Sequence, residues 1–204
     1  MDSRIFSTLH AICNLLAAIS MAAEMLKSRC DDVLVEEIKE ASERATLLLK
    51  DLILSPELPL ETINLNELIL KMEGEILQVL GEGIELVLEL ASDLQPIRAS
   101  GKQVERILMN LVKNARDAMP SGGQLIIRTE NCSGSVCLMV RDTGVGIRPE
   151  VMGRIFEPFF TTRERGVGLG LSVVRRAVEE IGGKIEVESK EGEGTTFRVF
   201  IPVG

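Results

Sequence analysis

The residues with the clearest chemical potential lie in two glycine-rich stretches. The first reads Asp142-Thr143-Gly144-Val145-Gly146-Ile147 and the second Gly166-Val167-Gly168-Leu169-Gly170-Leu171. Glycine allows positive φ and a close approach of the backbone to a ligand. Amides freed in such a loop at a helix N-terminus form an anion site. Because Asp142 ends an apolar run, we expect it to accept a hydrogen bond from an exocyclic amine of the ligand.

A second set of candidates lies on a helix predicted from Ser100 to Met119, opened by a capping box of Ser100 and Gln103. Asn110 and Asn114 are four positions apart and therefore share one helix face. The amide oxygen of Asn114 suits Mg²⁺, which prefers hard oxygen ligands and bridges phosphates. Asn110 can hydrogen-bond a phosphate or a metal-bound water. The alternative is that both asparagines simply face solvent.

The N-terminal segment shows a heptad pattern. Apolar residues recur at alternating spacings of four and three, first at Ile5, Leu9, Ile12, Leu16, Ile19, Ala23 and Leu26, then at Leu34, Ile38, Ala41, Ala45, Leu48 and Leu52. Pairing the two series antiparallel about a turn near Ser28 matches every layer, for example Ile19 with Ile38, and predicts a helical hairpin.

Further apolar residues lie outside this seam, at Leu15, Ala22, Val35 and Leu49. Two helices cannot bury them, but two hairpins can, as a four-helix bundle. We therefore predict a homodimer through the hairpin; packing against the rest of the same chain is the alternative. His10, the only histidine, falls one step off the seam. It is either a surface residue without a role or a neutral imidazole that attacks phosphorus.

These patterns predict an α+β fold with two domains. The helical hairpin covers residues 1–55, a linker with Pro56 and Pro59 covers 56–62, and an α/β sandwich with one mixed sheet and helices over one face covers 63–204. Within the second domain we expect a helix from Asn64 or Asn66 to about Leu80 and a later one from Val167 to Gly182-Gly183. The expected strands are 84–90, 124–129, 136–140, 185–189 and 196–201.

Composition narrows the function classes. A net charge of −8 argues against a nucleic-acid binder, which needs basic surface. No apolar run reaches the roughly 20 residues of a membrane span, so we expect no membrane contact by this segment and a cytoplasmic location. The cysteines at 13, 30, 132 and 137 lack metal-type or disulfide spacing. Cys132 and Cys137 could lie on neighbouring strands, but we expect buried, reduced thiols.

The motifs resemble those of bacterial sensor histidine kinases. Asn110-Leu111-x-x-Asn114-Ala115-x-x-Ala118 resembles the N box, Asp142-x-Gly144-x-Gly146 the G1 box, and Phe156-x-Pro158-Phe159 the F box. Gly166-x-Gly168-x-Gly170-Leu171 resembles the G2 box, and Gly194-Thr195-Thr196-Phe197 the last glycine box. The resemblance implies the Bergerat ATP-binding fold that gyrase-type ATPases and Hsp90 chaperones share.

The same resemblance implies roles for individual residues. Asp142 would hold the adenine amino group, Asn114 would ligate Mg²⁺, and Thr196 would lie beside Asp142. A mobile lid would run from about Phe159 to Val167. The implied nucleotide contacts are Asn110, Asn114, Asp117, Asp142, Gly144, Gly146, Ile147, Phe159, Thr162, Arg163, Gly166, Val167, Gly168, Leu169, Gly170, Leu171 and Thr196.

The hairpin also resembles the dimerisation and phosphotransfer domain of the family. The stretch from His10 to Leu16 is similar to its H box, which makes His10 the phosphoacceptor. Asn14, one turn later, matches the position that orients a water for dephosphorylation of the partner. Ala11 departs from the family, which usually carries an acidic residue there to help remove the histidine proton.

Three functions compete. The first is ATP-dependent autophosphorylation on His10, followed by transfer to an aspartate in the receiver domain of a response regulator. The second is a phosphorelay or scaffold protein that keeps the fold but has lost autokinase activity, which Ala11 would mark. The third is a GHKL ATPase that hydrolyses ATP. Gyrase-type relatives place a glutamate at the position of Asn110, and this chain does not.

Overall fold

The computed structural model describes residues 59–158, 160–162 and 168–204, with Ile12, Leu16, Ile19, Met21, Val35, Ile38, Ser42 and Ala45 from the N-terminal segment. Two compact units divide the chain, residues 1–57 and 58–204. No helix among the described residues is long and apolar enough to cross a membrane.

The described positions of the first unit are helical. The Ser42 hydroxyl donates a hydrogen bond to the Leu16 carbonyl. Ile19 and Ile38, which the predicted seam sets against each other, are 46% and 47% exposed, whereas Val35, placed outside the seam, is buried. The seam assignment is therefore wrong at these positions in the single chain. The predicted hairpin as a whole, with His10 and Asn14, lies outside the described residues.

The second unit begins with a short strand and a capped helix. Strand β1 (Glu61–Ile63) pairs antiparallel with β3 (Ile97–Ala99) in a small two-stranded sheet that the sequence did not predict. Helix α3 (Leu65–Leu80) starts at Asn64, whose side chain accepts hydrogen bonds from the amides of Asn66 and Glu67. This settles the predicted N-cap in favour of Asn64, because a cap oxygen satisfies amides that the first turn leaves unpaired.

A five-stranded mixed sheet forms the frame of this unit. Its strands are β2 (Ile84–Leu90), β4 (Gly123–Cys132), β5 (Ser135–Asp142), β6 (Lys184–Lys190) and β7 (Gly194–Pro202). They follow the order β2-β4-β5-β7-β6, with β2 and β4 parallel and every other pair antiparallel. The predicted mixed sheet is confirmed; β2 has the predicted bounds, and the other four strands extend one to three residues beyond theirs at each end.

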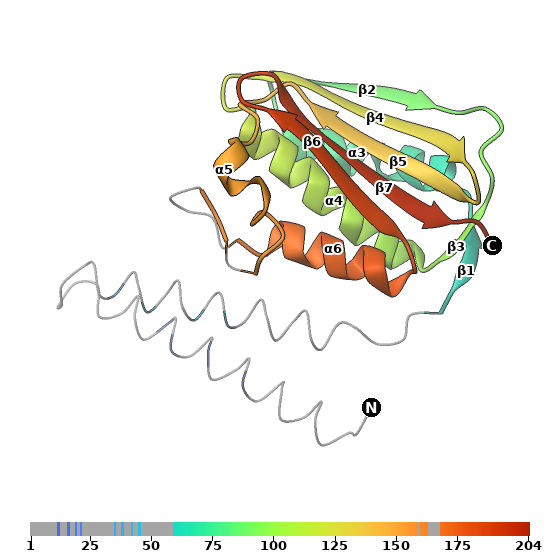
Figure 1. The fold of residues 1–204 in the computed structure, drawn as a ribbon, viewed down its shortest axis with the longest axis horizontal. Helices are drawn as coiled ribbons and strands as arrows, with labels where there is room; N and C mark the ends of the chain where they lie inside the picture. Colours follow the sequence, from blue (N-terminus) through green and yellow to red (C-terminus); the bar gives the residue numbers. More distant parts are fainter. Residues whose placement is uncertain are drawn as a thin grey trace. The chain divides into compact units, whose positions relative to one another are not determined.

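Helices α3, α4 (Gly101–Ala118) and α6 (Gly170–Glu180) cover one face of this sheet (Figure 1). Alternate strand residues face the helices, and those of the central strands are fully buried, such as Leu125, Ile127 and Leu138. The outer face carries Arg128, Glu130 and Arg141, all exposed. The core therefore lies between the sheet and one helical layer.

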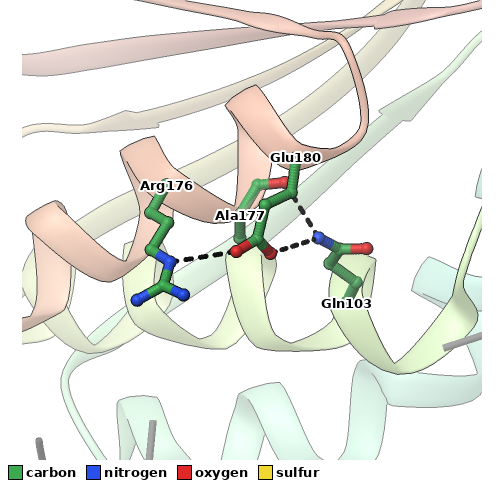
Figure 2. A network of polar contacts seen from close by, with 4 residues as sticks. All are labelled: Gln103, Arg176, Ala177 and Glu180. Atoms are coloured by element: carbon green, nitrogen blue, oxygen red, sulfur yellow. Dashed lines mark hydrogen bonds and ion pairs between the residues drawn. The ribbon is translucent and has the colours of Figure 1, made fainter. Parts of the chain in front are cut away.

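Helices α4 and α6 run antiparallel and are joined at one end by a polar network (Figure 2). The side-chain amide of Gln103 donates to the Ala177 carbonyl at 3.1 Å and to Glu180 Oε2 at 3.0 Å. Arg176 Nε also donates to Glu180, at Oε1. The predicted capping box is wrong, because Gln103 contacts the neighbouring helix and Ser100 makes no side-chain cap bond.

Two further differences concern the segment between β5 and α6. The short helix α5 (Pro149–Met152) was not predicted. Helix α6 begins at Gly170, three residues after the predicted start at Val167. Gly168 adopts φ 70°, a left-handed conformation that a right-handed helix excludes, so the helix cannot begin before it.

The two faces of β4 give a direct stability test. We expect Ile127→Ala to lower the free energy of unfolding by about 3 kcal/mol, since it leaves a cavity between sheet and helices. The matched change Ile126→Ala, on the half-buried outer face of the same strand, should cost about 1 kcal/mol. Urea unfolding measures both. Equal losses would contradict the one-sided core.

Candidate nucleotide-binding site

The asparagine pair of α4 lies directly against the start of α6. The side-chain amide nitrogen of Asn110 donates a hydrogen bond to the Arg106 carbonyl at 2.8 Å, one turn back along the helix. A Cβ atom built at Gly170 would lie 3.5 Å from Asn110 Oδ1 and 3.6 Å from each amide atom of Asn114. The fold therefore brings together the N-box and G2-box residues, which are far apart in the sequence.

Asp142 ends β5 with its carboxylate buried, at 4% exposure. One carboxylate oxygen, Oδ1, accepts hydrogen bonds from two backbone amides, that of Gly144 at 2.9 Å and that of Thr195 at 3.2 Å. Burial of a carboxylate is unfavourable unless hydrogen bonds replace its water shell. These two amides fix the side chain between the G1 loop and strand β7.

The loop after Asp142 is held at both sides. The Val145 amide donates to the Ala118 carbonyl at the end of α4, and the Val145 carbonyl accepts from the Gly192 amide in the β6–β7 turn. The Ile147 amide donates to the Ser189 hydroxyl at 2.8 Å. The loop thus connects the asparagine-bearing helix to the end of the sheet.

The glycines of this loop are required by the protein's own packing. A Cβ at Gly144 would lie 2.4 Å from the Ala118 carbonyl oxygen, and one at Gly146, where φ is 70°, would lie 2.2 Å from that of Lys190. At Gly194 the distance to the Asp142 carbonyl oxygen would be 2.0 Å. At these positions the close approach is between backbone and backbone, and not, as expected from the sequence, between backbone and ligand.

The second glycine cluster is described from Gly168 onward. Leu169 precedes the first turn of α6, and its carbonyl accepts from the Ser172 hydroxyl at 2.9 Å. The N-cap residue Leu169 makes no side-chain cap bond, and the first turn of a helix leaves amides without an intrahelical partner, here at the end that faces the asparagines. Gly166 and Val167 lie outside the described residues.

In the segment between the two glycine clusters, two phenylalanine rings are each contacted by an arginine guanidinium group. The Arg154 guanidinium lies 4.4 Å from the centre of the Phe160 ring, and that of Arg175, on α6, lies 5.8 Å from the Phe156 ring. Both rings also pack against the core. Thr162 is exposed, while Phe159 and Arg163 lie outside the described residues, as does most of the predicted lid.

The structure thus brings some predicted residues together and separates others. On α4, Asn110 and Asn114 lie beside Gly170 at the start of α6. The loop after Asp142 is hydrogen-bonded to the end of α4 through the Ala118 carbonyl. Leu169 and Leu171 flank the start of α6, and Leu171 packs against the core. Asp117 is exposed and pairs with its neighbour Arg116 at 2.5 Å.

Thr196 is the predicted site residue that the structure contradicts. It lies opposite Arg141 in the β5–β7 ladder, whereas Thr195 lies opposite Asp142 and donates its amide to the carboxylate. Successive residues of a strand point to opposite faces, so a shift of one position moves a side chain across the sheet. The residue beside Asp142 is therefore Thr195.

Sequence reasoning also missed Ser189. Its hydroxyl accepts from the Ile147 amide, donates to the Gly194 carbonyl at 2.9 Å and lies 2.9 Å from the Thr195 hydroxyl. It therefore links the G1 loop to the last glycine box. The only available signal was its place as the sole polar residue on the inward side of β6, opposite Thr195.

Comparison with known proteins shows which family has this arrangement. Residues 99–204, more than half of the chain, match the profile of the histidine kinase-, DNA gyrase B- and HSP90-like ATPases. The chain belongs to this family. The resemblance to sensor histidine kinases is confirmed by a relative as well. The sensor kinase CckA of Brucella abortus (strain 2308) is 36% identical over 218 residues, which cover 95% of this chain and 23% of CckA.

Solved structures agree with the fold. Full-length ShkA, crystallised in complex with AMPPNP, superposes with a TM-score of 0.73 at 25% identity, covering 99% of this chain and 46% of ShkA. The catalytic domain of the histidine kinase ThkA, in a nucleotide-free form, gives 0.61 at 33% identity, covering 71% of this chain and 96% of that domain. The chain thus spans less than half the length of CckA and of ShkA.

Two glycines of the β6–β7 turn test the backbone packing around Asp142. Gly194→Ala should lower the free energy of unfolding by about 3 kcal/mol or more, because its Cβ has to displace the backbone that ends β5. Gly192→Ala is the matched control: φ is also positive there, at 79° against 100° for Gly194, but the space around the new Cβ is open, so only about 1–2 kcal/mol of left-handed strain is expected. Thermal and urea unfolding report both. Equal costs would contradict the close contact at Gly194.

Proposed function

We propose that this chain is the catalytic core of a sensor histidine kinase. It binds ATP in the 63–204 domain, transfers the γ-phosphoryl group to His10, and passes it to an aspartate of a response regulator. The observation that carries the proposal is the meeting of Asn110 and Asn114 with the glycine-rich start of α6. That meeting provides hard oxygen ligands beside a helix N-terminus, where phosphate groups bind favourably.

Adenine recognition is assigned to Asp142. Its carboxylate is buried and oriented by the amides of Gly144 and Thr195. A carboxylate held in this way is a preorganised acceptor for the exocyclic amine of adenine. The free-energy cost of burying this charge is already offset when the domain folds. The carboxylate therefore needs little further ordering when adenine binds.

The residues present fit a magnesium ion. The amide oxygen of Asn114 is an uncharged hard ligand, the Asn110 amide can hydrogen-bond a phosphate or a metal-bound water, and a Gly170 side chain would occupy the space beside them. When bound, Mg²⁺ neutralises phosphate charge and aids departure of ADP. The amides at the start of α6 orient the same phosphates, and Thr162 and Arg163 are assigned to the lid that excludes water.

Phosphoryl transfer then follows from position. A neutral imidazole nitrogen of His10 forms the P–N bond as the bond from the γ-phosphorus to the bridging oxygen breaks; ADP leaves and the imidazole proton is released. The 56–62 linker allows the two domains to meet for this step. Asn14 is assigned to orient the water of the reverse, phosphatase reaction.

We further infer a homodimer through residues 1–55. Ile12, Ile19 and Ile38 are helical and between 37% and 47% exposed in the single chain. Apolar side chains on helices at such exposure are stabilised when a second copy covers them. ATP as the substrate and a response regulator as the partner are consistent with a cytoplasmic location.

One observation weighs against the ATPase alternative. Simple hydrolysis needs a general base to activate water, and the position from which gyrase-type relatives supply a glutamate carries Asn110. An amide cannot accept a proton at neutral pH, and its nitrogen is bound to the Arg106 carbonyl. Only an experiment distinguishes the scaffold function from the kinase function.

The nucleotide site is tested with Asp142→Asn. The amide should present an N–H group toward the adenine amine or toward the Gly144 and Thr195 amides, so we expect ATP affinity to fall at least about a hundredfold by calorimetry. Asp93→Asn, an exposed aspartate in the turn after β2, is the control and should bind ATP normally. Wild-type affinity in Asp142→Asn would refute the assignment.

The phosphoacceptor is tested by incubating the chain with γ-labelled ATP. We expect acid-labile, alkali-stable label that disappears in His10→Gln while ATP binding persists, because the two roles lie in separate units. Nucleotide binding without label would favour the scaffold. Steady release of phosphate without label would favour the ATPase.

A further inference from the structure

Three potential metal ligands gather on the outer face of the β4–β5 hairpin. Glu130 lies opposite Cys137 in the ladder, and Cys132, two residues after Glu130, lies opposite Ser135. The two cysteine sulfur atoms and a carboxylate oxygen of Glu130 all lie within 4.8 Å of one another. Cys132 is half-buried and Cys137 is buried.

This cluster is separate from the nucleotide site. It lies on the face of the sheet away from the helices, since alternate residues of β5, such as Val136 and Leu138, occupy the inner face. Asp142 is five residues further along the strand, about 17 Å at the usual rise per residue. None of the residues assigned to ATP belongs to this cluster.

The separation of Cys132 and Cys137 across the ladder does not favour a disulfide between them. Cys132 and Cys137 are diagonal neighbours across the ladder, and diagonal Cα atoms are about 7–8 Å apart. Disulfides need Cα separations below about 7 Å. Both cysteines are free thiols in the structure.

The spacing instead suits a tetrahedral ion. Zinc binds thiolate sulfur at about 2.3 Å, so two sulfur ligands of one ion lie about 3.7 Å apart. Groups that are already within 4.8 Å of one another need only small side-chain rotations to reach that arrangement. Two thiolates and one carboxylate leave the fourth position to water.

The surrounding charges are compatible with such an ion. Two thiolates, one carboxylate and a divalent cation sum to one negative charge. Arg198 lies one strand away and is paired with Glu188 at 2.8 Å, which offsets its positive charge.

We propose that Glu130, Cys132 and Cys137 form a binding site for a thiophilic divalent cation of the zinc type on the outer face of the ATP-binding domain. Thiolate ligands select zinc and similar ions over Mg²⁺, so this site and the nucleotide site take different metals. Each thiol releases one proton on binding, and no oxidation or reduction is involved.

The experiment uses the complete chain, freed of metal by a chelator and kept in a thiol-free reductant. Co²⁺ is added as a spectroscopic stand-in and then displaced by Zn²⁺. We expect one Co²⁺ per chain, a thiolate-to-cobalt charge-transfer band, and loss of that band on addition of Zn²⁺. Cys132→Ser should remove the band, and Glu130→Gln should weaken Zn²⁺ binding at least about tenfold.

The control is the double variant Cys13→Ser, Cys30→Ser, which removes the other two cysteines of the sequence and should keep the band. Because Cys137 is buried, Cys137→Ser can disturb folding, so Cys132 and the exposed Glu130 carry the test. Circular dichroism checks that each variant is folded. A band that persists in Cys132→Ser, or that is lost in the double variant, overturns the proposal, as does a wild-type chain that shows none.

Discussion

The buried carboxylate of Asp142 is the constraint on which the candidate site depends. A charge at 4% exposure is tolerated only with hydrogen-bond donors around it, and the Gly144 and Thr195 amides supply them from two different segments. Those amides reach Asp142 only if the G1 loop turns sharply and β7 stays in register with β5. The turn requires Gly144 and Gly146, and the register requires Gly194, where any side chain would collide with the Asp142 backbone.

Much of the second unit could be predicted because its signals are local. The Asn64 cap, the end of α3 at Gly81, and the inward alternation of β4 and β5 each depend on neighbouring residues. The asparagine pair was predicted for the same reason, since helix periodicity alone puts Asn110 and Asn114 on one face. Its contact with Gly170 joins segments that are far apart in the sequence, so only the fold shows it.

The errors share a physical cause, which is that tertiary contacts outweigh local preference. Gln103 has the right spacing for a capping box, yet α6 offers it a carbonyl and a carboxylate. Thr195 and Thr196 are alike in the sequence, and only the strand register tells which one faces Asp142. The isoleucines of the N-terminal segment fit a heptad seam, but the pattern cannot say whether the same chain or a second copy covers them.

The Gln103 fork has a mechanical consequence for α6. It ties the last turn of that helix to the first turn of α4, while the opposite end begins at Gly170, after an N-cap residue, Leu169, that makes no side-chain cap bond. Over 11 residues the helix is about 16 Å long, so a small rotation about the anchored end is amplified along its length. A rotation of α6 about that end would therefore change the position of Gly170 relative to Asn110 and Asn114 more than that of any other residue of the helix.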